Sequence, residues 1–122
     1  MGWADDLGSP PLGLQSSSLA DVRRLGPGET AQRALHAIPP SAPILLHFDI
    51  DVLNKQEMPA AYFPHADGLS LAETQELLST TMADSRLRII EVAEYASLRD
   101  LDRSAVAKII DILAAGLGRS GR

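Results

Sequence analysis

The sequence predicts an α/β fold in which parallel strands are flanked by helices. Two apolar runs, residues 44–50 and 86–95, indicate strands, and helical patterns precede, separate and follow them. Alternation of strands and helices is typical of parallel sheets joined by right-handed crossovers. The first run is continuously apolar from Ile44 to Leu46, which is typical of a strand covered on both faces.

Two helices are expected before the first strand. Ser18 is a suitable N-cap for a short helix that ends at the Gly-Pro-Gly segment, residues 26–28. Residues 29–38 predict a second helix, and the prolines at 39–40 stop it because the residue before a proline disfavours helical backbone. Residues 1–14 are expected to form an irregular lead-in, since glycine and proline recur there without a period.

Two further helices are expected after the first strand. Ser70 and Glu73 match the S-x-x-E capping box, in which each side chain binds a free amide of the first helical turn. Asp102 is expected to cap the last helix. Apolar residues recur in that helix at spacings of three and four and predict one buried face: Val106, Ile109, Ile110, Leu113 and Leu117. Gly116 and Gly118 suit the end of this helix.

The composition is that of an ordinary globular chain of 122 residues, long enough for one domain with its own core. The net charge of −5 does not favour a nucleic-acid or anionic-membrane surface. Cysteine is absent, which excludes disulfides and thiolate sites. No apolar run approaches the roughly 20 residues of a transmembrane helix. The acidic start, rich in proline and glycine, does not resemble a signal peptide, so a cytoplasmic protein is expected.

Two acids end the first strand, in the segment HFDID. Asp49 and Asp51 alternate with apolar residues, so both side chains are expected on one strand face, with alpha carbons roughly 6–7 Å apart. Open α/β sheets bind ligands at the carboxyl ends of their strands, and paired carboxylates suit hard cations. Glu91 has the corresponding late position in the second strand. Three carboxylates would therefore converge on one rim if the two strands are neighbours.

Simpler interpretations remain open for these groups. A single D-x-D is unspecific, because acids at strand ends also cap helices and line loops. His47 shares the expected face of the two aspartates, but its deeper position favours a hydrogen-bonded core histidine over a metal ligand. The charged residues of segment 94–102 are expected in a solvated loop that ends in a helix cap.

The order of these segments resembles the C-terminal part of the ureohydrolases, the family of arginase, agmatinase and formimidoylglutamase. The matching pieces are LLHFDIDVLN, GLSLAETQELL, LRIIEVAEY and RDLDRSAVAKIIDIL, and the likeness extends roughly over residues 14–117. The resemblance implies a partial three-layer arginase-like fold. Residues 1–14 would be the lead-in, residues 15–118 the ureohydrolase-like C-terminal α/β segment and residues 119–122 a tail.

The resemblance also implies a chemistry. Members of this family hydrolyse guanidino or amidino groups, with two manganese ions that activate a bridging hydroxide. By resemblance, Asp49 would bridge both ions, Asp51 would bind one of them, and Glu91 would hydrogen-bond the guanidinium group of the substrate. No residue of the chain is assigned a nucleophilic or proton-transfer role.

The chain departs from the family pattern in its ligand set. The upstream G-G-D-H-like and D-x-H-x-D segments, which supply the family's remaining ligands, are absent, and Asn54-Lys55 replaces the usual D-P. We therefore expect the isolated chain to bind manganese weakly, to hydrolyse nothing, and to self-associate or require a complementary chain. Two alternatives stay open. One is an inactive ureohydrolase-like fragment or association module, and the other is a haloacid-dehalogenase-type phosphatase, which FDIDVL also resembles.

Overall fold

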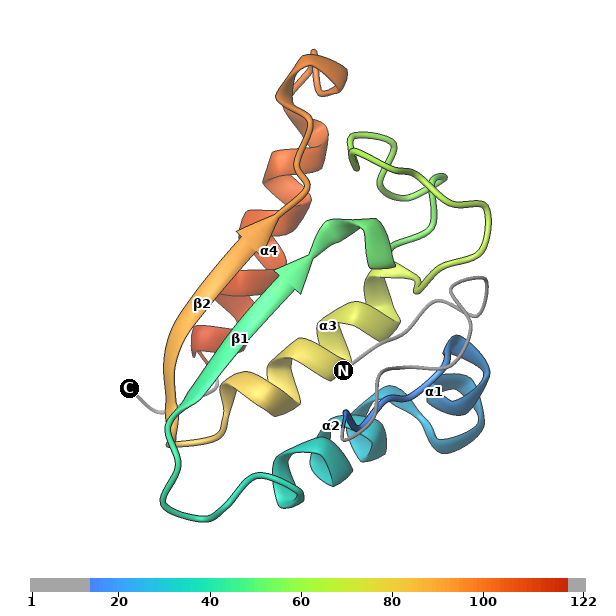
Figure 1. Ribbon diagram of the computed structural model, residues 1–122. Helices are drawn as coiled ribbons and strands as arrows, with labels where there is room; N and C mark the ends of the chain where they lie inside the picture. Colours follow the sequence, from blue (N-terminus) through green and yellow to red (C-terminus); the bar gives the residue numbers. More distant parts are fainter. Residues whose placement is uncertain (1–13, 119–122) are drawn as a thin grey trace.

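A computed structural model describes residues 14–118 as two parallel strands backed by helices (Figure 1). The predicted tail and nearly all of the predicted lead-in lie outside the described residues. The elements follow one another in the order α1 (Leu19–Leu25), α2 (Pro27–His36), β1 (Ile44–Asp49), the 3₁₀ turn η2 (Ile50–Val52), α3 (Leu71–Met82), β2 (Leu87–Ala93), the 3₁₀ turn η3 (Ser97–Arg99) and α4 (Ser104–Gly118). Among these residues, no helix is both long and apolar enough to cross a bilayer.

The sheet consists of β1 and β2, paired in parallel as predicted. Helices α3 and α4 lie behind the strands in Figure 1 and cover one face of the sheet. On the opposite face, Leu45 is 57% exposed and Ile89, its partner in the register, is 55% exposed. The prediction that the first strand is covered on both faces is therefore wrong for residues 14–118, since their helices pack on one side only.

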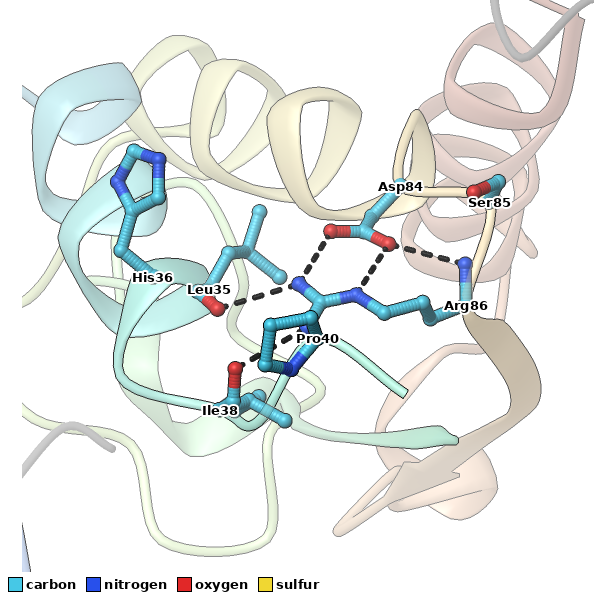
Figure 2. A pocket seen from close by; sticks show the side chains of 7 residues that line it. All are labelled: Leu35, His36, Ile38, Pro40, Asp84, Ser85 and Arg86. Atoms are coloured by element: carbon cyan, nitrogen blue, oxygen red, sulfur yellow. Dashed lines mark hydrogen bonds and ion pairs between the residues drawn. The ribbon is translucent and has the colours of Figure 1, made fainter. Parts of the chain in front are cut away.

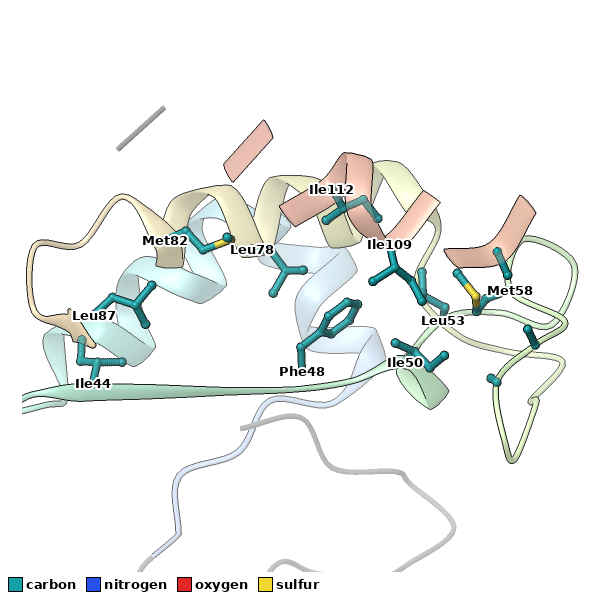
Figure 3. Close-up of a cluster of buried hydrophobic side chains, with 13 residues drawn as sticks. Ile44, Phe48, Ile50, Leu53, Met58, Leu78, Met82, Leu87, Ile109 and Ile112 are labelled. Carbon is teal, nitrogen blue, oxygen red and sulfur yellow. The ribbon is translucent and has the colours of Figure 1, made fainter. Parts of the chain in front are cut away.

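The core lies between the covered face of the sheet and the two long helices (Figure 3). Side chains alternate across a strand, so every second residue of β1 points into this core. The largest buried side chains come from both strands, both helices and the loop after β1: Ile44, Phe48, Leu87, Leu78, Met82, Ile109, Ile112, Ile50, Leu53 and Met58. The loop thus contributes to the core as well as connecting β1 to α3.

The buried face of α4 differs from the predicted one. Ile109 and Ile112 are buried, whereas Ile110 is 57% exposed and Leu117 is 42% exposed. Gly116 lies inside the helix and faces α3, where an added Cβ atom would come within 2.5 Å of the Met82 sulfur. This glycine lets the two helices approach closely, and its predicted role at the helix end is wrong.

Two capping boxes start the helices as the sequence pattern indicates. The Ser70 side chain accepts from the Glu73 amide at 3.0 Å, and the Ser70 amide donates to the Glu73 carboxylate at 2.9 Å. Ser18 and Asp21 form the same reciprocal pair at α1. These bonds satisfy amides that would otherwise have no partner in the first turn. Helix α2 starts two residues earlier than predicted, because proline at position 27 is favourable in the first turn.

The start of α4 depends mainly on Asp100, which is only 4% exposed. Its carboxylate accepts from the amides of Ala105 and Val106, each at 2.9 Å, and from the Tyr95 hydroxyl at 2.6 Å. Burial acts to raise the pKa of Asp100, but the Tyr95 hydroxyl and the two amides outweigh it and hold that pKa below its usual value. Asp102 accepts from one amide, that of Ser104. Helix α4 begins at Ser104, so Asp100 rather than Asp102 supplies the main cap, and the predicted cap names the wrong residue. The interpretation of segment 94–102 as wholly solvated is also wrong, because Asp100 is buried.

Candidate metal and substrate site

The two candidate metal ligands stand where β1 ends. Asp49 is the last residue of the strand, and its carboxylate accepts from the Asp51 amide at 2.8 Å. That hydrogen bond makes Asp49 the N-cap of η2, so Asp51 lies on the turn rather than on the strand. The expectation that both acids share one strand face is wrong, although both remain at the carboxyl end of β1.

The loop from residue 54 to residue 68 is tied to this site. The Phe63 amide donates to the Asp51 carboxylate at 3.0 Å. Within the loop, the Asn54 side chain accepts from the Glu57 amide at 3.0 Å and donates to the Glu57 carboxylate at 2.9 Å. Asn54, at the position of the departure from the family's D-P, therefore orders the start of the loop.

The end of the loop packs directly on the backbone at its start. A Cβ atom at Gly68 would come within 2.7 Å of both the Asn54 nitrogen and the Leu53 carbonyl carbon. The Arg23 guanidinium donates to the Gly68 carbonyl at 3.0 Å. These contacts give the loop a defined path over the carboxyl end of β1.

Glu91 is hydrogen-bonded to His47, its neighbour across the sheet. The His47 Nδ1 and Glu91 Oε2 atoms are 2.9 Å apart, and the two side chains are 50% and 60% exposed. The hydrogen bond to Glu91 raises the pKa of His47, although desolvation acts in the opposite direction. His47 is hydrogen-bonded as expected, but it lies on the open sheet face and not in the core. The pairing depends on the register of the two strands, in which His47 lies opposite Glu91.

The carboxylates present suit a hard cation but do not complete a dinuclear centre. Within residues 14–118, the side-chain hydrogen bonds to Asp49 and Asp51 go to their Oδ1 atoms, and the Oδ2 atoms accept none of them. In the same described part of the chain, no group of three histidine, aspartate or glutamate side chains converges to hold a metal ion. Asp49 and Asp51 are thus candidate ligands, and the described residues do not bring a third such side chain to them.

Two cavities lie away from the Asp49 and Asp51 carboxylates. The first, about 500 Å³, is lined by residues of α2 and of the turn between α3 and β2, and Figure 2 shows the Arg86 guanidinium lying across it. That guanidinium is paired with Asp84 and with backbone carbonyls, which indicates a structural role. The second cavity, about 360 Å³, lies beside Tyr62 and Arg99, close to the loop that reaches Asp51.

Comparison with known proteins identifies the family of this chain. The arginase family model matches residues 9–117. This chain belongs to the arginase family. Among curated members, the N(omega)-hydroxy-L-arginine amidinohydrolase of Streptomyces lavendulae is 39% identical over 98 residues, which is 78% of this chain and 35% of that protein.

Solved structures of arginase-family proteins share the fold. Arginase from Bacillus subtilis matches with a TM-score of 0.79 and 18% identity, over 87% of this chain and 38% of its own. Formiminoglutamase from Trypanosoma cruzi, solved with Mn²⁺, matches with a TM-score of 0.77 and 20% identity, over 88% of this chain and 36% of its own. The chain thus spans little more than a third of these relatives. The predicted partial arginase-like fold, with parallel strands and flanking helices, is confirmed.

Proposed function

We propose that this chain contributes two ligands of a manganese site, at the carboxyl end of β1, to an arginase-family amidinohydrolase. Asp49 and Asp51 would be metal ligands, and Glu91 would bind the guanidino or amidino group of the substrate. Residues 15–118 would form the family's C-terminal α/β segment, flanked by the lead-in 1–14 and the tail 119–122. The site needs further ligands from outside this set, through additional sequence or a complementary chain.

The observation that carries this proposal is the position of Asp49 and Asp51 in a chain of this family. Both stand at the carboxyl end of a parallel strand, where α/β sheets bind ligands, and hard oxygen ligands match Mn²⁺. Bound manganese ions would supply an activated hydroxide. The residues of this chain would hold the ions and orient the substrate, since a carboxylate such as Glu91 pairs with a planar guanidinium through parallel hydrogen bonds.

The name of the Streptomyces relative supports a guanidino compound as the substrate class. An inactive arginase-like fragment or association module is the main alternative, and the partial ligand set favours it for the chain alone. Family membership argues against the phosphatase alternative.

The proposal is tested by titrating the purified 122-residue chain with Mn²⁺ and following the electron paramagnetic resonance signal of the free ion. We expect weak binding, and we expect the double variant Asp49→Asn, Asp51→Asn to weaken it by about tenfold or more, as is typical when a ligand or its support is lost. Asp111→Asn, in an exposed part of α4, is the matched control. Light scattering with and without Mn²⁺ would show whether metal binding drives assembly.

Manganese binding that is unchanged in the double variant would reject Asp49 and Asp51 as ligands. A urea-release assay belongs beside the titration. Hydrolysis by the isolated chain, free of contaminating enzyme, would contradict the proposal that the site is incomplete.

A further inference from the structure

Arg99 is an exposed side chain whose guanidinium is nevertheless held in one orientation. Its Nη1 atom donates to the carbonyls of Ala61 and Tyr62, at 3.0 Å and 2.9 Å. The guanidinium carbon also lies 5.9 Å from the centre of the Tyr62 ring, within the range of a cation–π contact. The side chain is therefore anchored on one edge and stacked over an aromatic ring.

The opposite edge of this guanidinium faces no such anchor. Among the hydrogen bonds of residues 14–118, the Arg99 side chain uses Nη1 alone, which leaves Nε and Nη2 as a pair of parallel donors. Such a pair of donors matches the two oxygens of a carboxylate. A guanidinium can therefore bind a carboxylate through two parallel hydrogen bonds, whereas a lysine ammonium lacks this paired geometry.

The backbone that carries Arg99 is itself ordered. The Arg99 amide donates to the Ala96 carbonyl at 2.9 Å, and the Ala96 amide donates to the Ala60 carbonyl at 2.8 Å. Asp100, the residue after Arg99, is buried, and its carboxylate accepts hydrogen bonds from two amides at the start of α4. Ligand binding would then cost little ordering of the loop, which is how preorganised sites gain affinity.

Arg99 is one of the residues that line a cavity of about 360 Å³. Tyr62, Tyr95 and Leu98 supply apolar surface, while Ser97 and Arg99 supply polar groups. Apolar walls with a few placed polar groups are typical of small-molecule sites, and this volume is within their usual range of about 300–1,000 Å³.

We propose that this cavity is a carboxylate subsite, in which the Nε and Nη2 atoms of Arg99 bind the carboxylate of a guanidino acid. The assignment of the ligand rests on the proposed function. Tyr62 adjoins Phe63, whose amide holds Asp51, so one short loop serves both the metal ligands and the cavity. Tyr95, which lines the cavity, comes four residues after Glu91, so the alpha carbons of the two residues are at most about 13 Å apart at the rise of a strand. The cavity therefore lies at the same end of β2 as Glu91, the proposed partner of the substrate's guanidinium group.

The subsite is tested on the full 122-residue chain by following the arginine Nε–Hε signals in ¹⁵N–¹H spectra. Arg99→Lys identifies the Arg99 signal by its loss and keeps the charge without the paired donors. Sodium propionate is the probe, and propionamide at matched ionic strength is its neutral counterpart. We expect propionate to shift the Arg99 signal selectively and saturably, and propionamide to leave it in place. Arg103→Lys, on the same loop but outside the cavity, should leave the propionate response unchanged.

A second titration compares L-arginine with agmatine, which carries the same guanidinium without the carboxylate. We expect L-arginine to bind several-fold more tightly, and Arg99→Lys to remove that difference. An unmoved Arg99 signal, a uniform response of all arginines, or a larger response to inorganic phosphate than to propionate would overturn the carboxylate subsite. Propionate binding without preference for L-arginine would overturn the substrate assignment. Failure of Asp49 and Asp51 to bind Mn²⁺ would instead refute the proposed function and leave the propionate result standing.

Discussion

Asp84 holds the Arg86 guanidinium in a two-point ion pair. Nε donates to the Asp84 Oδ1 atom at 2.9 Å, and Nη2 contacts the Oδ2 atom at 2.7 Å (Figure 2). The same guanidinium donates to the carbonyl of Leu35, in the last turn of α2, and to those of Ile38 and Pro39 just after the helix. Helix ends leave carbonyls without partners, so this arginine closes α2 and joins it to the turn before β2.

The Asp84–Arg86 pair predicts a loss of stability in acid. Hydrogen bonds from Arg86 lower the pKa of Asp84 from 3.8 to about 2. Because the folded-state pKa lies below the unfolded one, the stabilisation is present above about pH 4 and is lost as pH falls towards 2. After allowance for solvent screening, we expect Asp84→Asn to lower the free energy of unfolding at pH 7 by about 1–2 kcal/mol.

Urea unfolding of Asp84→Asn and the parent chain at pH 7 and at pH 2.5 measures this effect. The difference between them should shrink at the lower pH. Asp111→Asn, in an exposed stretch of α4, is the control and should follow the parent chain at both values. An equal loss of stability by Asp84→Asn at both pH values would contradict the electrostatic explanation.

Gly68 predicts a steric effect at the end of the loop. Its missing side chain faces the backbone of Asn54, which cannot move aside as a flexible side chain can. Gly68→Ala should therefore cost about 1–3 kcal/mol of stability, as overpacking does. Gly118→Ala is the matched control, since nothing lies within 4 Å of the added methyl group, and it should be neutral or slightly stabilising. Thermal denaturation compares the two, and equal midpoints would show that the loop adjusts freely.

The observed buried face of α4 predicts that alanine substitution destabilises the protein at Ile112 but hardly changes its stability at Ile110. Ile112 is 4% exposed and packs in the core, so Ile112→Ala should cost about 2–5 kcal/mol. Ile110 is 57% exposed, and Ile110→Ala should change stability by less than about 0.5 kcal/mol. Chemical denaturation of both variants is the measurement. A larger loss at Ile110 would restore the face that the sequence pattern predicts.

The open sheet face predicts association. Leu45 and Ile89 are exposed side by side on a two-stranded sheet, and exposed apolar surface beside unpaired strand edges promotes self-pairing. Sedimentation velocity should show concentration-dependent association of the parent chain. The double variant Leu45→Glu, Ile89→Glu should reduce it.

Leu101→Glu is the control for that experiment, because Leu101 is 90% exposed on the loop between β2 and α4 rather than on the sheet. Association that persists in the double variant but disappears with Leu101→Glu would place the contact on that loop. A monomeric parent chain at all concentrations would contradict the prediction outright.

Local signals in the sequence were enough to place the elements. The S-x-x-E pattern at Ser70 gave the start of α3, Pro39 followed the end of α2, and two apolar runs gave β1 and β2. Each of these signals acts within a few residues through capping, backbone restriction or side-chain periodicity, so no distant contact is needed to interpret it. The sequence also predicted the position of Asp49 at a strand end, since the two acids alternate with apolar residues where the apolar run gives way to a polar segment.

The tertiary structure decided what each side chain meets. Whether Ile110 or Ile112 is buried depends on the angle at which α4 packs on α3, and the close approach at Gly116 sets that packing. The bond between His47 and Glu91 depends on the register of two strands that are distant in sequence. The sequence by itself determined the elements, the arginase-family pattern and the candidate ligands. Only the packing decided that Asp100 is buried, that Arg99 is anchored and that one sheet face is open, because these properties arise between segments and not within them.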